Sequence, residues 1–325
     1  MASQSGGCAT AGRRHRRAVT DARPGGGAHF FDAKVLVPFT IVTFIWGSTW
    51  LVIRDQVSDV PASWSVTYRF LIAAAAMFLL ARIRRVPLWL GWPGMAFAAF
   101  LGVMQFVLNF NLVYRAEMHL TSGLVAMLYA LLLVPNSLLS WVAFREAVSR
   151  PFILGSFIAI CGIALLFLHE YRMSGVAPDQ VLLGMALGIG GTLAASVANV
   201  MQGSGIARRL PMASTLAWGM LLGGLADAVV AWALHGPPVI DTRPTYLAGV
   251  LYLAIAGSVV TFPLYYRLIQ RLGAGRAAYS SVLIPIIAML LSTLFEGYRW
   301  SPLALAGAAL ALLGMVVAMR AKTAS

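Results

Sequence analysis

Long apolar runs separated by short polar linkers occupy this sequence from residue 35 to residue 320. A helix that crosses about 30 Å of hydrocarbon needs roughly 20 predominantly apolar residues. The linkers carry Pro, Gly and Arg and leave no room for a soluble domain. We therefore predict an all-α, polytopic membrane protein with ten transmembrane helices, at residues 35–53, 64–82, 94–114, 121–144, 151–169, 181–201, 212–234, 245–266, 277–295 and 302–320.

The composition supports this interpretation. Apolar residues make up 60% of the chain and charged residues 11%, against about 45–50% and about 25% in soluble proteins. These values argue against a cytosolic enzyme and a disordered chain. The net charge of +13 does not indicate a nucleic-acid partner, because the basic residues lie in short clusters between apolar runs.

The distribution of basic residues predicts the orientation. Eighteen of the 24 Lys and Arg residues fall on one side of the ten predicted spans, five fall on the other, and Arg69 lies inside a span. Cytoplasmic loops carry the excess of positive charge, so we expect both termini in the cytoplasm. Residues 1–33 are rich in Gly, Ser and Arg, which predicts a disordered cytoplasmic tail.

The chain contains an internal repeat. Residues 114–123 and 266–275 share the pattern Y-R-x-x-x-x-L-x-x-G. Downstream, Pro135 and Glu146 are separated by eleven positions, as are Pro285 and Glu296. Small residues then recur with one spacing at 155, 159 and 162 and at 307, 311 and 314. These stripes have helical spacing and predict close helix packing.

The repeats divide the chain into residues 34–169 and 181–320, with five predicted spans each. Because five is odd, the second half enters the membrane upside down. Inverted repeats are typical of secondary carriers, in which two halves rock about a site near the midplane. Some channels also contain inverted repeats, so the pattern favours a carrier without excluding a channel.

These motifs, with Trp46-Gly47-Ser48 in the first span and Arg69-Phe70 in the second, resemble the drug/metabolite transporter superfamily, EamA type. The resemblance covers nearly the whole chain except residues 1–33. It implies a carrier in the cytoplasmic (inner) membrane that exports or exchanges small metabolites. It also implies that the first, third and fourth spans of each half line a central cavity. The second half departs from the pattern, because it lacks counterparts of Arg69 and of Trp-Gly-Ser.

Polar and aromatic side chains inside spans are the candidates for substrate binding, because polar groups there are costly and often functional. An interhelical hydrogen bond or core packing is the competing explanation for each of them. The expected substrate-binding residues are Trp46, Asn109, Tyr129, Asn136 and Asn199.

Four further residues are candidates for gating or coupling. Pro135 and Pro285 lie near mid-span, where proline kinks a helix. Arg69 lies near a span end, where it could snorkel, pair with Asp55 or Asp59, or bind an anionic group. An ionised carboxylate at the depth of Asp227 is expensive. Asp227 therefore suits a proton-coupling site, unless it is paired with a residue such as Arg69 or faces water on the outer side.

No enzyme signature accompanies these residues: the sequence has no metal-binding His pair, H-E-x-x-H motif or phosphate-binding loop. We therefore predict no cofactor, no metal and no catalytic residue. The expected partners are a small-molecule substrate such as an amino acid or related amphiphile, the lipid bilayer, and a proton or solute counter-gradient. We expect a monomer or homodimer. The alternative is a channel-like or non-transporting protein of the same fold.

Overall fold

The structure is a computed structural model that describes residues 33–57, 59–145, 148–173, 177–278 and 280–322. These residues form helices and contain no β-strand, which confirms the all-α prediction. The predicted tail up to residue 32 and the repeat residue Glu146 lie outside the described residues. The first half contains α1 (Ala33–Gln56), α2 (Ala62–Ile83), α3 (Gly91–Leu101), the π-helix η1 (Gly102–Asn109), α4 (Phe110–Ala116), α5 (Ser122–Ala130), α6 (Leu133–Phe144) and α7 (Arg150–Met173).

The second half follows the same order. It contains α8 (Pro178–Gln202), the short α9 (Gly205–Arg209), α10 (Met212–His235), α11 (Pro244–Ala254), the π-helix η2 (Ile255–Val260), α12 (Thr261–Leu272), α13 (Ala274–Ala277), α14 (Ser280–Phe295) and α15 (Pro302–Lys322). Gly236 and Gly273 follow the ends of α10 and α12 with φ of 75° and 83°, a conformation that glycine adopts at little steric cost.

Eight helical segments among the described residues are long and apolar enough to cross a membrane. They correspond to the first eight predicted spans. The last two predicted spans, 277–295 and 302–320, correspond to α14 and α15, within which Leu283–Phe295 and Pro302–Ala318 are apolar. The chain is thus a multi-pass membrane protein, and the count of ten spans stays a prediction.

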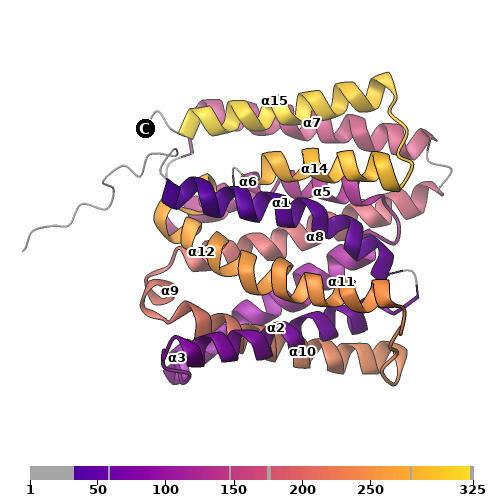
Figure 1. The fold of residues 1–325 in the computed structure, drawn as a ribbon. Helices are drawn as coiled ribbons and strands as arrows, with labels where there is room; N and C mark the ends of the chain where they lie inside the picture. Colours follow the sequence, from indigo (N-terminus) through magenta and orange to yellow (C-terminus); the bar gives the residue numbers. More distant parts are fainter. Residues whose placement is uncertain (1–32, 58, 146–147, 174–176, 279, 323–325) are drawn as a thin grey trace, which may run out of the picture.

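The helices stack in layers (Figure 1). The pair α7 and α15 lies at the top of the view, and the pair α2 and α10 lies at the bottom with α3. Helices α1, α5, α8, α12 and α14 occupy the space between these pairs. Helix α14 packs against both α1 and α5, so elements from distant parts of the sequence meet in the middle of the bundle.

The two halves share an unusual local feature. The third predicted span of each half is interrupted by a π-helix, η1 in the first and η2 in the second. Aligning the two Y-R motifs superimposes residues 102–109 on residues 254–261, and η2 covers 255–260. The repeat in the sequence is therefore also a repeat in backbone geometry.

The small-residue stripes pack the two halves together, as their spacing predicts. A Cβ atom added at Gly155 would lie 2.6 Å from the carbonyl oxygen of Gly314, and one at Gly162 would lie 2.6 Å from that of Gly307. Only glycine allows backbones to approach this closely. The contacts run in opposite directions along the chain, so α7 and α15 are antiparallel, as expected for inverted halves.

The fourth span breaks just before Pro135. Helix α5 ends at Ala130, and α6 begins at Leu133. Proline cannot donate a main-chain hydrogen bond, and its ring clashes with the carbonyl group four residues earlier, which here belongs to Leu131. The amide N–H of Val134 instead donates to the Leu131 carbonyl oxygen at 2.8 Å. The proline therefore divides the span into two helices.

Candidate functional site

A cavity lies in the middle of the bundle, between the two halves. Its wall comes from α1, η1, α4, α5 and the Leu132 turn in the first half, and from α8, α12 and α14 in the second. These are the first, third and fourth spans of each half, as the family resemblance implied. Arg69 of α2 also lines the cavity.

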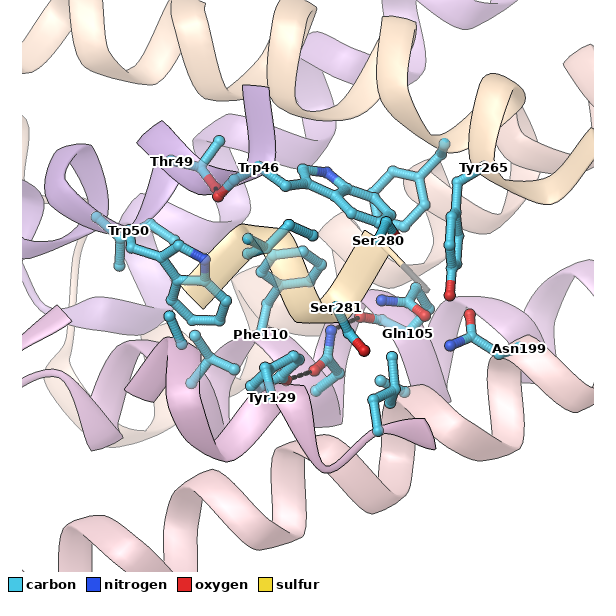
Figure 2. Close-up of a pocket in the computed structure, with 18 of the residues that line it drawn as sticks. Trp46, Thr49, Trp50, Gln105, Phe110, Tyr129, Asn199, Tyr265, Ser280 and Ser281 are labelled. Atoms are coloured by element: carbon cyan, nitrogen blue, oxygen red, sulfur yellow. Dashed lines mark hydrogen bonds between the residues drawn. The ribbon is translucent and has the colours of Figure 1, made fainter. Parts of the chain in front are cut away.

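Aromatic side chains form much of the wall (Figure 2). At one end, the rings of Trp50 and Tyr129 meet edge to face with their centroids 5.0 Å apart. At the other end, the Tyr265 hydroxyl and the Asn199 amide point towards one another. Trp46 lies between these ends and contacts the Tyr265 ring at 4.8 Å between centroids.

Arg69 is 1% exposed and is fixed by three hydrogen bonds. Its Nε donates to Ser258 Oγ at 3.1 Å, one terminal nitrogen donates to the Gly257 carbonyl oxygen at 3.3 Å, and the other donates to the Tyr114 hydroxyl at 3.4 Å. The guanidinium also lies 4.4 Å from the centroid of the Phe110 ring, a cation–π contact. Among the described residues no carboxylate pairs with it, and Asp55 and Asp59 instead face Arg243.

Polar groups that line the cavity differ in how fully they are satisfied. Tyr129 donates a hydrogen bond to the Asn109 side-chain oxygen. The Asn109 amide donates to the Gln105 carbonyl oxygen at 3.2 Å. The Asn199 side chain faces the cavity, and the Trp50 indole N–H is buried without a partner in the described chain. These last two groups are available to a ligand.

Five of the nine residues expected at the site line the cavity: Trp46, Asn109, Tyr129, Asn199 and Arg69. The other four do not. Pro135 faces a second, apolar pocket beside Leu131 and Ile160. Pro285 is buried in α14 next to Ile284, which does line the cavity. Asn136 is completely buried, and both polar atoms of its side chain lack a partner among the described residues.

Asp227 lies away from the cavity, between α2, α4 and α10. Its Oδ1 accepts a hydrogen bond from the Asn111 amide at 2.6 Å, and Asn111 Oδ1 accepts one from Ser63 at 2.8 Å. Arg69, which the sequence offered as a possible partner of Asp227, instead bonds to Ser258, Gly257 and Tyr114. This chain of side-chain bonds ties three helices together.

Several cavity residues were not expected from the sequence. They are Thr49, Trp50, Ile53, Gln105, Phe110, Val113, Ala126, Leu132, Ala195, Phe262, Tyr265, Ser280, Ser281 and Ile284. Ser280 and Ser281 resemble ordinary small residues at the start of an apolar run, and no signal marked them. Gln105 and Tyr265 each place a polar atom inside a predicted span, but residues that only pack against other helices often do the same.

Comparison with known proteins gives a family match over both halves. The model described as the EamA-like transporter family matches residues 35–168 and 182–320. Together the two matches cover most of the chain.

Curated relatives and solved structures extend the comparison. The Protein PagO of Salmonella typhimurium is 26% identical over 82% of this chain and 87% of its own length. A probable amino-acid metabolite efflux pump of the same organism is 23% identical over 85% and 92%, and its namesake in Escherichia coli is 22% identical over the same shares. One crystal structure superimposes with a TM-score of 0.66 over 88% of this chain and 97% of its own, at 20% identity, which supports the fold.

Proposed function

Because the chain belongs to the EamA-like transporter family and is a multi-pass membrane transporter, we propose that it is a secondary carrier working by alternating access. In this proposal ten spans form two inverted halves, and the halves rock about the central cavity. The protein would reside in the cytoplasmic membrane with both termini in the cytoplasm. It would export or exchange its substrate against a proton or solute gradient.

The observation that carries the proposal is the position of the cavity. Its wall is built from corresponding spans of the two halves. Among them are the two third spans, which contribute η1 and α4 in the first half and α12 in the second. A site at such an interface changes its access when the halves move relative to one another. The antiparallel packing of α7 and α15 supports the inversion that this motion requires.

The wall supports small amphiphilic substrates with a carboxylate, of which amino acids are the first to test. Aromatic rings suit an apolar side chain. Arg69 has three of its five N–H donors engaged, so two donors would be left for an anion. Asn199 and the Trp50 indole would bind further polar groups. Two relatives bear names that specify amino-acid metabolite efflux, which is consistent with this class.

Roles for the remaining expected residues follow from their contacts. We propose Trp46, Asn109, Tyr129 and Asn199 as substrate-binding residues and Arg69 as both an anion-binding and a positioning residue. The bonded chain through Asn111 supports a structural role for Asp227. The breaks and bends around Pro135 and Pro285 would shape the two fourth spans.

Reconstituted proteoliposomes provide the test. Vesicles loaded with one unlabelled amino acid at a time would be placed in a trace of the same labelled amino acid. A carrier accumulates the label by counterflow and saturates, whereas a channel allows only equilibration. Counterflow for at least one amino acid is expected, and a higher KM for it in the Asn199→Ala variant would connect it with the cavity.

A second arm covers substrates outside this class. Metabolites that accumulate in inverted membrane vesicles with and without the protein would be compared by mass spectrometry. Label that equilibrates without counterflow would support the channel alternative. No movement of any solute in either arm would contradict the transport proposal.

A further inference from the structure

Two glutamates lie close together at one end of the bundle, which we call the Glu296 end. Helices α1 and α14 end there, on the right of Figure 1. Glu117 lies in the linker between α4 and α5 and is completely buried. Both of its carboxylate oxygens lack a hydrogen-bond partner in the part of the chain that the structure describes. The cavity mechanism leaves this side chain without a role.

Glu296 comes from the other half of the chain, directly after α14. Its Oε2 accepts hydrogen bonds from the main-chain N–H of Ser122 at 3.3 Å and from the Ser122 hydroxyl at 2.8 Å. Its Oε1 is buried without a partner among the described residues. Because Ser122 begins α5, Glu296 holds the end of α14 against the linker that contains Glu117.

Charged and titratable groups from α1, α4 and α5 act on Glu117. Arg54 at the end of α1 donates to the main-chain carbonyl oxygens of Glu117 and Leu120. Tyr114 and Tyr129 also interact electrostatically with Glu117, and each donates to an amide oxygen: Tyr114 to Gln56 and Tyr129 to Asn109. Neither glutamate forms an ion pair with a described residue.

Two hydroxyl groups near the glutamates are also buried without a hydrogen-bond partner among the described residues. Ser292 is completely buried and lies one helical turn before Glu296, on the same face of α14. Its hydroxyl and that of Thr121 have no partner among the described residues. Buried polar atoms are normally satisfied, so this concentration of free oxygens indicates that a ligand is bound in some state of the protein.

Charge identifies the ligand. Two unpaired carboxylates at such a site cannot both stay ionised at reasonable cost. Burial raises the pKa of Glu117 well above its ordinary range, the nearby Glu296 raises it further, and Arg54 partly opposes both effects. A proton removes the repulsion and converts one acceptor into a donor. A proton is therefore the ligand that relieves the repulsion between the carboxylates without needing space for further atoms.

We propose that Glu117 and Glu296 form a proton-binding site between the two halves, whose occupancy keeps the Glu296 end closed. The proton comes from water at this end and is bound by one of the two carboxylates, so the pair carries a single negative charge. Loss of the proton leaves two negative charges, which repel α14 from the linker. The site would be the coupling site of the proposed carrier, and to that extent it rests on the proposed function.

The direction of the pH dependence follows from the raised pKa. The protonated pair favours the closed arrangement at low pH. This preference is lost as the pH rises through the raised pKa of Glu117, above the value of about 4.3 for an unperturbed glutamate.

Proton binding can be measured without a substrate. The purified full-length chain in lipid nanodiscs would be titrated while the infrared C=O stretching band of protonated carboxyl groups is recorded. A band that disappears with rising pH above the ordinary glutamate range is expected. It should be lost in Glu117→Gln and should move to lower pH in Glu296→Gln, where Glu117 stays buried but loses its acidic neighbour. It should persist in Asp227→Asn, which removes a second buried carboxyl, and in Asp179→Asn, which removes an exposed acid at the start of α8.

Closure needs a separate readout. Spin labels would be placed at Met118→Cys and Arg299→Cys, two exposed positions on either side of the site, with Cys8 and Cys161 replaced by Ser. The distance is expected to lengthen with rising pH in the otherwise native chain. It should stay short at every pH in Glu117→Gln and Glu296→Gln, because an amide resembles the protonated acid.

Three outcomes would overturn the proposal: no pH-dependent change, a change that survives in both glutamine variants, or a change at constant pH when sodium replaces choline. The last would identify a metal cation as the ligand. If one glutamine variant fails to fold, the other and Ser122→Ala, which removes the hydroxyl donor to Glu296, test the same site. Because no substrate is present, a failure here is distinct from a failure of the counterflow test.

Discussion

Arg69 shows how one buried charge can serve both structure and binding. Its bonds to Ser258 and to the Gly257 carbonyl oxygen fix α2 against the π-helix η2. It is also the cationic side chain on the cavity wall within the described residues. An arginine suits this double position because its planar group offers donors in several directions, which a lysine ammonium cannot reproduce.

Arg69→Lys is therefore expected to weaken the binding of substrates that carry a carboxylate. Hydrogen bonds to charged groups contribute about 1.5–3 kcal/mol, which corresponds to a rise in KM of roughly ten- to hundredfold. Transport of the matching amino-acid amide, which lacks the negative charge, should change far less. Counterflow with the two substrates measures the difference. Equal losses for both would show that Arg69 only supports the fold.

The asparagines provide a matched pair. Asn199 lines the cavity with a free amide, whereas Asn136 is buried away from it without a partner among the described residues. Asn199→Ala should raise KM about tenfold, as expected for one lost hydrogen bond. Asn136→Ala should leave KM unchanged, because it removes a polar group that is already unsatisfied. Counterflow at equal protein levels compares the two, and the opposite ranking would contradict the proposed site.

The sequence identified those site residues whose chemistry is unusual inside a span. Arg69, Asn109 and Asn199 stand out there and do line the cavity. Asn136 stands out equally but lies elsewhere, because the break before Pro135 changes the face that the following residues present. The sequence does not mark Glu117 as a candidate, because it directly follows the end of a span, where a carboxylate normally reaches water.

At the scale of elements, glycine contacts hold α7 and α15 together. The added Cβ at Gly162 would collide with the main chain of Ala311 and Gly307, which cannot move independently. Gly205 offers a comparison, because nothing lies within 4 Å of its added Cβ. The two positions separate the effect of packing from the general effect of replacing a glycine.

Gly162→Ala is expected to destabilise the protein by about 1–3 kcal/mol, the usual cost of overpacking. Gly205→Ala should leave stability unchanged or slightly raised, since alanine favours the first turn of α9. Thermal unfolding in detergent, followed by loss of the monodisperse peak in size-exclusion chromatography, compares the variants. A tolerated Gly162→Ala would mean that α7 and α15 are separated by more than the structure indicates.

Element boundaries were predictable where hydrophobic length determines them. The predicted span 94–114 corresponds to Gly91–Ala116, and 212–234 to Met212–His235. The predicted span 302–320 likewise corresponds to α15, which covers Pro302–Lys322. The interruptions η1 and η2 were not predictable, because a π-helix changes hydrogen bonding without changing which residues are apolar.

At the scale of the whole molecule, exposed ion pairs also join the two halves at the Glu296 end. Arg243, before α11, lies 2.7 Å from Asp59 and 4.0 Å from Asp55 of the first half, and 2.6 Å from Asp241 of its own half. The main-chain N–H and guanidinium of Arg243 lower the pKa of Asp241. This contribution to stability is present above the ordinary aspartate pKa and is lost as the pH falls through the lowered value.

Because these pairs are exposed, they should adjust the position of the halves more than the stability of the fold. With spin labels at Met118→Cys and Ile240→Cys, raising the salt to about 1 M, where the screening length is about 3 Å, should lengthen the distance in the native background. In Arg243→Gln the distance between the labels should already be longer at low salt and should no longer change when salt is added. In Arg243→Lys part of the change with salt should remain. A full salt response in Arg243→Gln would place the screened charges elsewhere, and closure of this end would then depend on its buried carboxyl pair alone.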